Sequence, residues 1–247
     1  MAYRRTPAVQ ARLDAQREAV LQSAVGLLAE RGYGGCTMAA VADRAGIATG
    51  SVYQHFANKA ELSVELFRRV VTREMAAVNT AVSLRDTPQR RIAAVVETFA
   101  ARALRAPRLA YALLVEPADA VVDGERLVFR RAFRDVIATE IAAAVAAGEL
   151  PEQDPVLTAA ALVGAVGEAL AGPLAAAPVE TTAPAETAET SGKAGKAETA
   201  GRAEAPETAE TVGKAEPSEP QRATAEVVPA LVSFTLRALG GRDDSDA

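Results

Sequence analysis

The segment TMAAVADRAGIATGSVYQHF, residues 37–56, predicts two short helices separated by a tight turn. Apolar residues recur at helical spacing in its first half, at Val41, Ala42 and Ala45. Thr37 stands where its hydroxyl can cap the first helix, and Gly46 can adopt the positive φ that ends it. Ile47 is expected to plug into the core, and Thr49 to cap the second helix. Two helices joined by a short glycine-containing turn form a helix-turn-helix, whose second helix enters the major groove of DNA.

The second helix offers small and polar side chains to a partner. Val52 and Phe56, four residues apart, are expected to face the core. The residues at its start are small enough for the backbone to approach DNA. Farther along, Tyr53, His55 and Lys59 can contact phosphates, and Gln54 can read a base edge. The candidate DNA-binding residues are Thr37, Thr49, Gly50, Ser51, Tyr53, Gln54, His55 and Lys59.

The pattern G-I-A-T-G-S-V-Y-Q-H-F-x-N-K-x-x-L over residues 46–62 resembles the TetR/AcrR family of transcriptional repressors. It is preceded by E-R-G-Y and by T-M-x-x-V-A-D-R-A, as in that family. The matching positions are Gly46, Ser51, Tyr53, His55, Phe56, Lys59 and Leu62. The resemblance is specific over 14–74 and only architectural beyond.

The resemblance implies an all-α fold. An N-terminal three-helix DNA-binding domain with the helix-turn-helix would precede a helical bundle that binds a ligand and dimerises. The implied function is that of a homodimeric repressor, which a small-molecule effector releases from double-stranded operator DNA. No cofactor and no metal are implied.

Composition agrees with a helical protein acting in the cytoplasm. Of the 247 residues 49% are hydrophobic but only 4% aromatic, and the many alanines favour helices over strands. The single cysteine, Cys36, excludes a disulfide framework, fits a reducing compartment and is expected to be a small buried hydrophobe. No uninterrupted apolar run reaches the roughly 18 residues that span a bilayer, so neither a membrane partner nor a signal peptide is expected.

The net charge of −5 hides an uneven distribution along the chain. Residues 1–75 carry ten basic and seven acidic groups, whereas residues 178–226 carry five basic and ten acidic groups. The N-terminal end is therefore basic, as binding to DNA phosphates requires.

The chain divides into five segments. Residues 1–13 are expected to be a flexible basic arm, which either reaches DNA or is a solvated tail. The DNA-binding domain covers 14–74, with a first helix over 14–31. A linking helix begins at Asn58, where Glu61 can complete a capping box, and runs toward residue 81. The effector-binding and dimerisation domain covers 75–175. Residues 176–225 are of low complexity and expected to be a disordered insert, and 226–241 the final helix.

Cap-plus-proline pairs predict two of the helices of the second domain. Thr87-Pro88 opens a helix to about residue 104, and Asp154-Pro155 opens one to about 171. Between them, helices are expected over 108–115 and 123–147. The 156–171 helix carries small residues at Ala160, Gly164, Gly167 and Ala171, which would admit a closely packed helix. That helix would belong either to a second subunit or to the same one.

The effector site is the least determined part. Its candidate wall residues are Phe99, Leu104, Tyr111, Leu114, Phe129 and Phe133, all of which could equally be ordinary core. The arginines 102, 105, 130, 131 and 134 could face an anionic ligand or form a solvated face.

Two other classes of function are alternatives to a ligand-responsive regulator. An enzyme is disfavoured because the only histidine, His55, lies in the recognition helix, and a ligand-independent architectural or adaptor protein is the second alternative.

Overall fold

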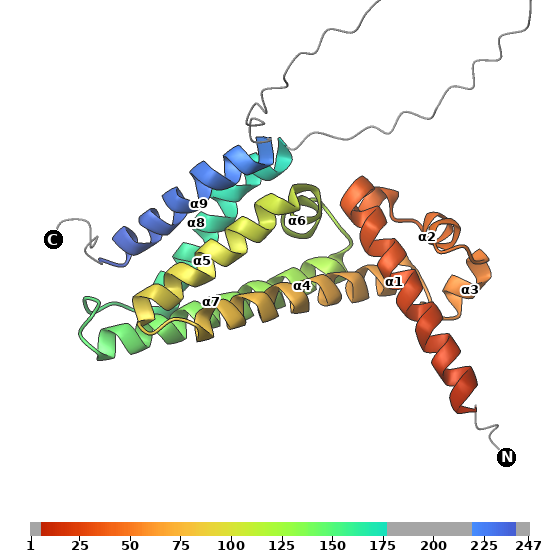
Figure 1. Cartoon of the computed structure of the whole chain (residues 1–247), viewed down its shortest axis with the longest axis horizontal. Coiled ribbons are helices and arrows are strands. Elements are labelled where there is room, and N and C mark those ends of the chain that lie inside the picture. The colour runs from red at the N-terminus through yellow and green to blue at the C-terminus, as the bar shows by residue number, and fades with distance from the viewer. Residues whose placement is uncertain (1–5, 177–218, 241–247) are drawn as a thin grey trace, which may run out of the picture.

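The computed structural model describes residues 6–176 and 219–240, which form nine helices and no strand (Figure 1). The expectation of an all-α fold is confirmed. The helices are α1 (Pro7–Gly35), α2 (Met38–Arg44), α3 (Thr49–Tyr53), α4 (Lys59–Ser83), α5 (Pro88–Arg105), α6 (Pro107–Leu114), α7 (Ala120–Ala146), α8 (Pro155–Ala175) and α9 (Glu219–Ala238).

Side-chain caps start several of these helices where the sequence predicts them. The side chains of Thr37, Asn58, Thr87 and Asp154 accept backbone N–H groups at the starts of α2, α4, α5 and α8. The capping box at α4 differs in one bond, because the Glu61 carboxylate accepts the N–H of Ala57, at 2.7 Å, rather than that of Asn58.

Three predicted boundaries are corrected. The arm is not flexible over 7–13, because α1 begins at Pro7 with Thr6 as its cap. Gly32, with φ 64° and ψ −170°, is non-helical and interrupts α1 where the sequence predicts that the first helix ends, and a short helical turn then follows to Gly35. Thr49 does not cap α3; it is the first helical residue, and Ala48 precedes it without a side-chain hydrogen bond. The final helix begins at Glu219 rather than 226, so the low-complexity segment ends earlier; residues 177–218 lie outside the described part of the chain.

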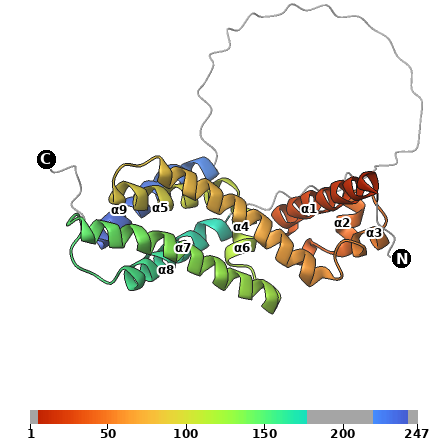
Figure 2. The same ribbon diagram turned by 90° about the horizontal axis from the view of Figure 1, so that it is seen from below.

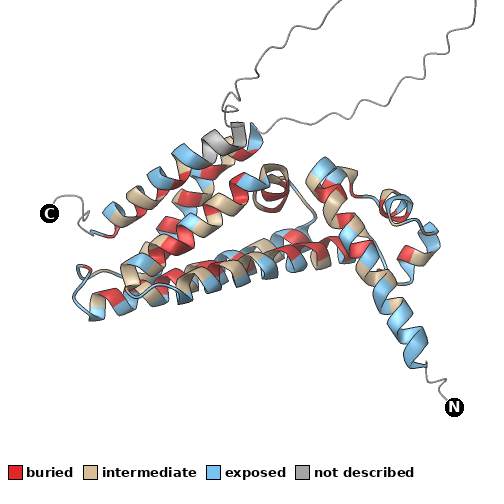
Figure 3. Ribbon diagram, in the orientation of Figure 1, coloured by how far each residue is buried: buried red, intermediate tan, exposed pale blue. Residues whose placement is uncertain are grey.

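The helices form two packed groups connected by α4. One hydrophobic cluster joins α1, α2, α3 and the start of α4, and two further clusters fill the bundle of α4–α9, the body. Figure 2 shows α4 running from the first group into the body. Buried residues gather on the inward helix faces, whereas the first turns of α1 are exposed (Figure 3).

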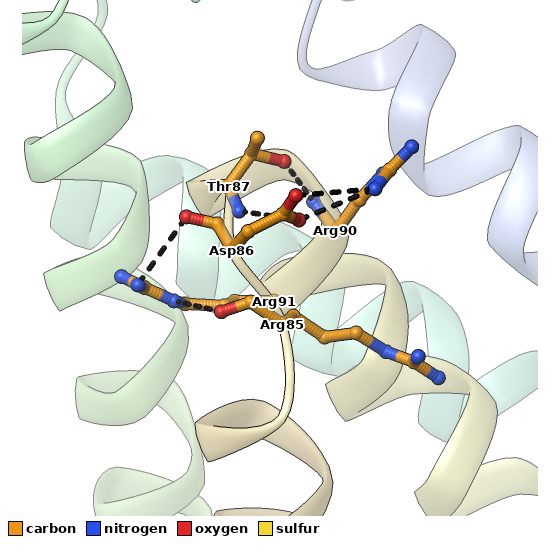
Figure 4. A network of polar contacts seen from close by, with 5 residues as sticks. All are labelled: Arg85, Asp86, Thr87, Arg90 and Arg91. Atoms are coloured by element: carbon orange, nitrogen blue, oxygen red, sulfur yellow. Dashed lines mark hydrogen bonds and ion pairs between the residues drawn. The ribbon is translucent and has the colours of Figure 1, made fainter.

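The α4–α5 turn is held by an arginine network at the end of the body away from α2 and α3 (Figure 4). Arg91 donates to the carbonyl oxygen of Arg85 at 3.0 Å and pairs with Glu140 of α7 at 3.3 Å. Asp86 pairs with Arg90 and accepts the N–H of Thr87. Arg91 thus satisfies a backbone carbonyl of the turn that follows α4 and connects this turn to α7.

Helix α8 is apolar on all sides but buried on only one. Its inward residues pack against α6 and α7, at Ala159, Leu162, Val166, Leu170 and Leu174. Among the described residues it is the one helix long and apolar enough to cross a membrane, with mean hydropathy 1.5, although Thr158 and Glu168 interrupt the apolar run. A bundle helix whose second face packs against another subunit has the same composition. The length and composition of α8 are therefore weak evidence of a membrane span.

Candidate nucleic-acid interface and adjoining cavities

Helices α2 and α3 form a compact helix-turn-helix. Gly46 adopts φ 66° and reverses the chain, and the N–H of Ile47 then bonds the carbonyl oxygen of Ala42 at 3.0 Å. Ile47 is half-buried against the same cluster as Val52, which fixes α3 on the core. The turn geometry predicted from the sequence is therefore present.

The structure brings the eight candidate DNA-binding residues to one region of the chain, with unequal exposure. Thr37, Thr49, Gly50, Tyr53 and Gln54 are exposed, whereas Ser51, His55 and Lys59 are half-buried. The ring of Tyr53 is 52% exposed, which is unusual for a large side chain without a partner. A Cβ built on Gly50 would meet nothing within 4 Å, so no packing inside this chain requires a glycine there. That space suits close approach by an external molecule.

Contacts from α1 that the sequence analysis missed hold the segment directly after α3 in place. Gln16 Oε1 lies 3.0 Å from His55 Nε2, and the Arg17 guanidinium lies 5.0 Å from the centre of the Phe56 ring. Arg17 also pairs with Glu65 of α4 at 3.1 Å. The only sequence signal was complementary charge at helical spacing on α1 and α4, which does not show how the two helices cross.

Several basic groups of this region are already paired. Arg44 bonds Glu30 with both guanidinium nitrogens, and Arg69 bonds Glu18 in the same way. These bonds lower the pKa of both glutamates, so the pairs stay ionised at neutral pH. Among the described residues up to 65, Arg12, Arg31 and Lys59 make no ion pair. These three cations remain available to phosphates.

Cys36 is buried at the start of the helix-turn-helix, as expected. It is 1% exposed, and its thiol lies 3.8 Å from the carbonyl oxygen of Ala24. Burial raises the pKa of the thiol to about 11, so it stays protonated and behaves as a small hydrophobe.

The body contains a cavity of about 330 Å³ between α4, α5, α6 and α7, called here the inner cavity. Its walls are apolar apart from four charged residues, and consist of Phe67, Val70, Val71, Arg73, Glu74, Phe99, Arg102, Ala103, Arg105, Ala106, Leu109, Ala110, Leu113, Leu114 and Phe129. Glu74 and Arg102 form a two-bond pair in this wall. Burial is the largest single influence on the pKa of the Glu74 carboxyl and would raise it, but the hydrogen bonds and positive charges of Arg102 and Arg73 together keep that pKa below its usual 4.5.

A second cavity of about 640 Å³, called here the outer cavity, adjoins the first between α7 and α8. It shares Phe99, Leu114 and Phe129 with the inner cavity, and its other walls are Val115, Leu127, Arg130, Arg131, Phe133, Arg134, Ala160, Val163, Gly164, Val166, Gly167, Glu168 and Ala171. Here a Cβ on Gly164 or Gly167 would meet nothing within 4 Å. The alternative that a helix of the same subunit packs closely against these glycines is therefore wrong for the described residues.

Four of the six predicted wall residues line these cavities. Phe99, Leu114 and Phe129 line both cavities, and Phe133 lines the outer one. Tyr111 and Leu104 line neither and pack in a neighbouring hydrophobic cluster. The sequence analysis missed the contribution of α4, because it treated that helix only as a link. Phe67, Val70 and Glu74 at helical spacing were the available signal.

A joint between α1 and α6 lies next to the inner cavity. The carboxylate of Glu116, just after α6, accepts the N–H of Tyr33 at 3.0 Å. Arg126 of α7 donates to the carbonyl oxygens of Ala112 and Leu113, both at 2.8 Å, and lies 5.9 Å from the centre of the Tyr33 ring. A wall of the inner cavity is thus bonded to the helix that supports α3.

Comparison with known proteins gives the family. Residues 20–66 match the family model described as "Bacterial regulatory proteins, tetR family". FasR, an HTH-type transcriptional activator of Mycolicibacterium smegmatis, is 34% identical over 86 residues, which are 35% of this chain and 39% of that protein. KstR2, an HTH-type transcriptional repressor of Mycobacterium tuberculosis, is 42% identical over 60 residues, 24% of this chain and 30% of that protein. The chain therefore matches well under half the length of either relative.

Solved structures extend the likeness to the whole fold. The transcriptional regulator FadR of Bacillus subtilis, solved in complex with stearoyl-CoA, superposes with a TM-score of 0.61 at 16% identity, over 87% of this chain and 97% of that one. A TetR/AcrR-family regulator from Thermobifida fusca gives 0.58 at 19% identity, over 93% of this chain and all of that one. The solved structures show that the fold of the body is shared, and the match over residues 20–66 shows that the chain carries the DNA-binding domain of the TetR family of bacterial regulatory proteins.

Proposed function

We propose that this chain is a cytoplasmic, homodimeric transcriptional repressor that a small-molecule effector releases from operator DNA. The observation that carries the proposal is the exposed group on α3 and its C-cap, where Thr49, Gly50, Tyr53 and Gln54 are exposed and are followed in the chain by Lys59, which makes no ion pair with the described residues. Such a surface suits a major groove and its phosphates. The division into a DNA-binding domain over 14–74 and a body over 75–175 belongs to the same proposal.

The two cavities favour a ligand-responsive regulator over the ligand-independent architectural or adaptor protein. The inner cavity of about 330 Å³ among Phe67, Phe99 and Phe129 is apolar and of the size that small-molecule sites have. FadR, with its bound stearoyl-CoA, supports a ligand for this fold. The relatives include both an activator and a repressor, so the sign of regulation is part of the proposal.

Open small residues on α8 support the homodimer. The exposed Val156 and Leu157 lie on the same helix as Gly164 and Gly167, whose Cβ positions are unobstructed. Two half-sites on operator DNA require two such helix-turn-helix units held at a fixed spacing.

Lys59 tests the proposed DNA contact. It begins α4, is half-buried and makes no ion pair with the described residues. Lys59→Ala should weaken operator and random DNA about equally, with a salt slope shallower by about one unit, because one phosphate contact is lost. Arg85→Ala, which removes one charge at the α4–α5 turn, is the matched control and should change neither. Fluorescence anisotropy across a salt series measures the DNA affinity and its dependence on salt. If the salt slope of Lys59→Ala equals that of the parent protein, the phosphate contact is rejected.

A further inference from the structure

The linings of the two cavities limit the chemistry of the ligand. Among the described residues, every lining side chain is either apolar or charged, and none in either wall is a hydroxyl, an amide or an imidazole. Most of the lining residues lie within helices, whose backbone N–H and C=O groups are already bonded to each other. A ligand rich in neutral hydroxyl or carbonyl groups would leave these groups unpaired, which weakens its binding. The polar part of the ligand must therefore be ionic and confined to one place.

The charged residues differ between the cavities. In the inner cavity Glu74 is bonded to Arg102 and lies 3.3 Å from Arg73, which leaves Arg105 as the wall residue with no ion pair among the described residues. The outer cavity has three arginines within five residues of α7, at positions 130, 131 and 134, and a single carboxylate, Glu168 of α8. Only Arg134 has a carboxylate within ion-pair distance among the described residues, its neighbour Asp135 at 2.7 Å. Like charges three or four residues apart destabilise a helix, and an anion between them removes that repulsion.

The shared wall allows one ligand to occupy both cavities. Phe99 and Leu114 are only half-buried, and Phe99 packs on Phe133 with ring centres 4.8 Å apart. Phe129 continues this row of rings, 5.9 Å from Phe133 and 6.4 Å from Phe67. A slender apolar chain that turns Phe99 and Leu114 aside would keep aromatic contacts along its whole length, whereas a bulky rigid body would not pass.

We propose that the effector is a long-chain amphipathic anion. Its unbranched apolar chain lies in the inner cavity and crosses the wall of Phe99 and Leu114, and its carboxylate or phosphate head lies at Arg130, Arg131 and Arg134. The guanidinium groups of arginine suit either head, because they donate paired N–H groups to planar or tetrahedral oxyanions. The head would lie opposite Gly164 and Gly167 of α8, next to the proposed dimer face. The assignment rests on the proposed ligand-responsive function.

Four probes test this class by isothermal titration calorimetry below their aggregation concentrations. Hexadecanoate and hexadecyl phosphate carry the two heads, hexadecanol lacks the charge, and octanoate lacks the length. At least one of the two long anions should bind about tenfold or more tightly than hexadecanol and octanoate, since one charge-assisted contact is worth about 1.5–3 kcal/mol. The tighter of the two anions identifies the head. Binding of hexadecanol as tight as that of both anions, or no binding of any long-chain probe, would overturn the proposal.

Two variants locate the ligand. The triple change Arg130→Gln, Arg131→Gln and Arg134→Gln should weaken the anion about tenfold or more and leave hexadecanol unchanged, whereas Arg85→Gln, an arginine outside both cavities, should change neither. Leu114→Phe, which narrows the shared wall, should weaken hexadecanoate more than octanoate. Unchanged anion affinity in the triple variant would overturn the head assignment. Operator binding by the ligand-free parent protein is measured separately. If the parent protein does not bind operator DNA, the proposed function is wrong, whereas the calorimetry still decides the ligand class.

Discussion

Glu74 shows how a single residue can make the stability of the body depend on pH. Its carboxylate accepts two bonds from Arg102 in the inner cavity wall, and its pKa is lower in the folded protein than its usual 4.5. A group with a lowered folded pKa stabilises the protein above its unfolded pKa, and that contribution disappears as the pH falls through the folded value. Glu74→Gln should therefore lower the free energy of unfolding at pH 7 by about 1–2 kcal/mol, since Arg102 loses its ionic partner.

The pH series is the check on this prediction. The difference in Tm between the parent protein and Glu74→Gln should be largest near neutral pH and shrink steadily below pH 4.5, where the parent carboxylate becomes protonated. Glu97→Gln, on the exposed side of α5, is the control and should show little difference at any pH. A difference for Glu74→Gln that stays constant down to pH 3 would contradict the ionic origin.

Residue roles were predictable from sequence where they depend on near neighbours in the chain. The caps at Thr37 and Asn58 involve residues three positions away, so the pattern identifies them. The contact between Gln16 and His55 joins residues 39 positions apart, and it depends on how α1 crosses α3. No local pattern contains that angle.

The joint between α1 and α6 is the element-scale feature with the sharpest test. Gly32 has φ 64°, and a Cβ there would overlap the Glu116 carboxylate that holds Tyr33. Gly32→Ala should therefore suffer the left-handed strain of about 1–2 kcal/mol and also displace Glu116. Gly46→Ala, with φ 66° but open space around its Cβ, should suffer only the strain.

Urea unfolding of both variants separates the two effects. The loss in free energy of unfolding should be larger for Gly32→Ala than for Gly46→Ala, and adding Glu116→Ala should cost less in the Gly32→Ala background than in the parent protein. Equal losses for the two glycine variants, with no coupling to Glu116, would mean that the carboxylate does not occupy the space beside Gly32.

Elements were predicted better in number and type than in extent. Helical spacing and cap-plus-proline pairs gave α5 and α8 nearly to the residue at their starts. Gly32 interrupts the first helix with a positive φ as predicted, whereas the short helical turn after it was not predicted, because its bond from the N–H of Tyr33 to Glu116 joins residues 83 positions apart. The cavity walls were predicted only in part. Their aromatic residues have the spacing of core residues, and which of them line a cavity depends on how α4 to α8 pack.

At the scale of the whole molecule, the proposed dimer can be tested through Gly164. Its Cβ position is unobstructed, so Gly164→Leu has room in the monomer, and it should raise intrinsic helix stability by about 0.5–1 kcal/mol. If the variant no longer forms a dimer, the cause would then be a clash of the leucine side chain with the second subunit. We expect light scattering to show monomers, and operator affinity to fall by about a hundredfold or more, because the two half-sites are no longer held together.

Gly124→Leu separates the interface from the general effect of the substitution. Gly124 is also exposed and helical, with open space around its Cβ, but it lies on α7 near the joint with α6. This variant should remain dimeric and keep its operator affinity. Gly164 also lines the outer cavity, so ligand binding is no neutral control, and the Tm of both variants is measured to show that the body is intact. A Gly164→Leu protein that stays dimeric would exclude close helix approach at this position, and the dimer would then have to form through another part of α8 or through α9, where Phe234 is 43% exposed.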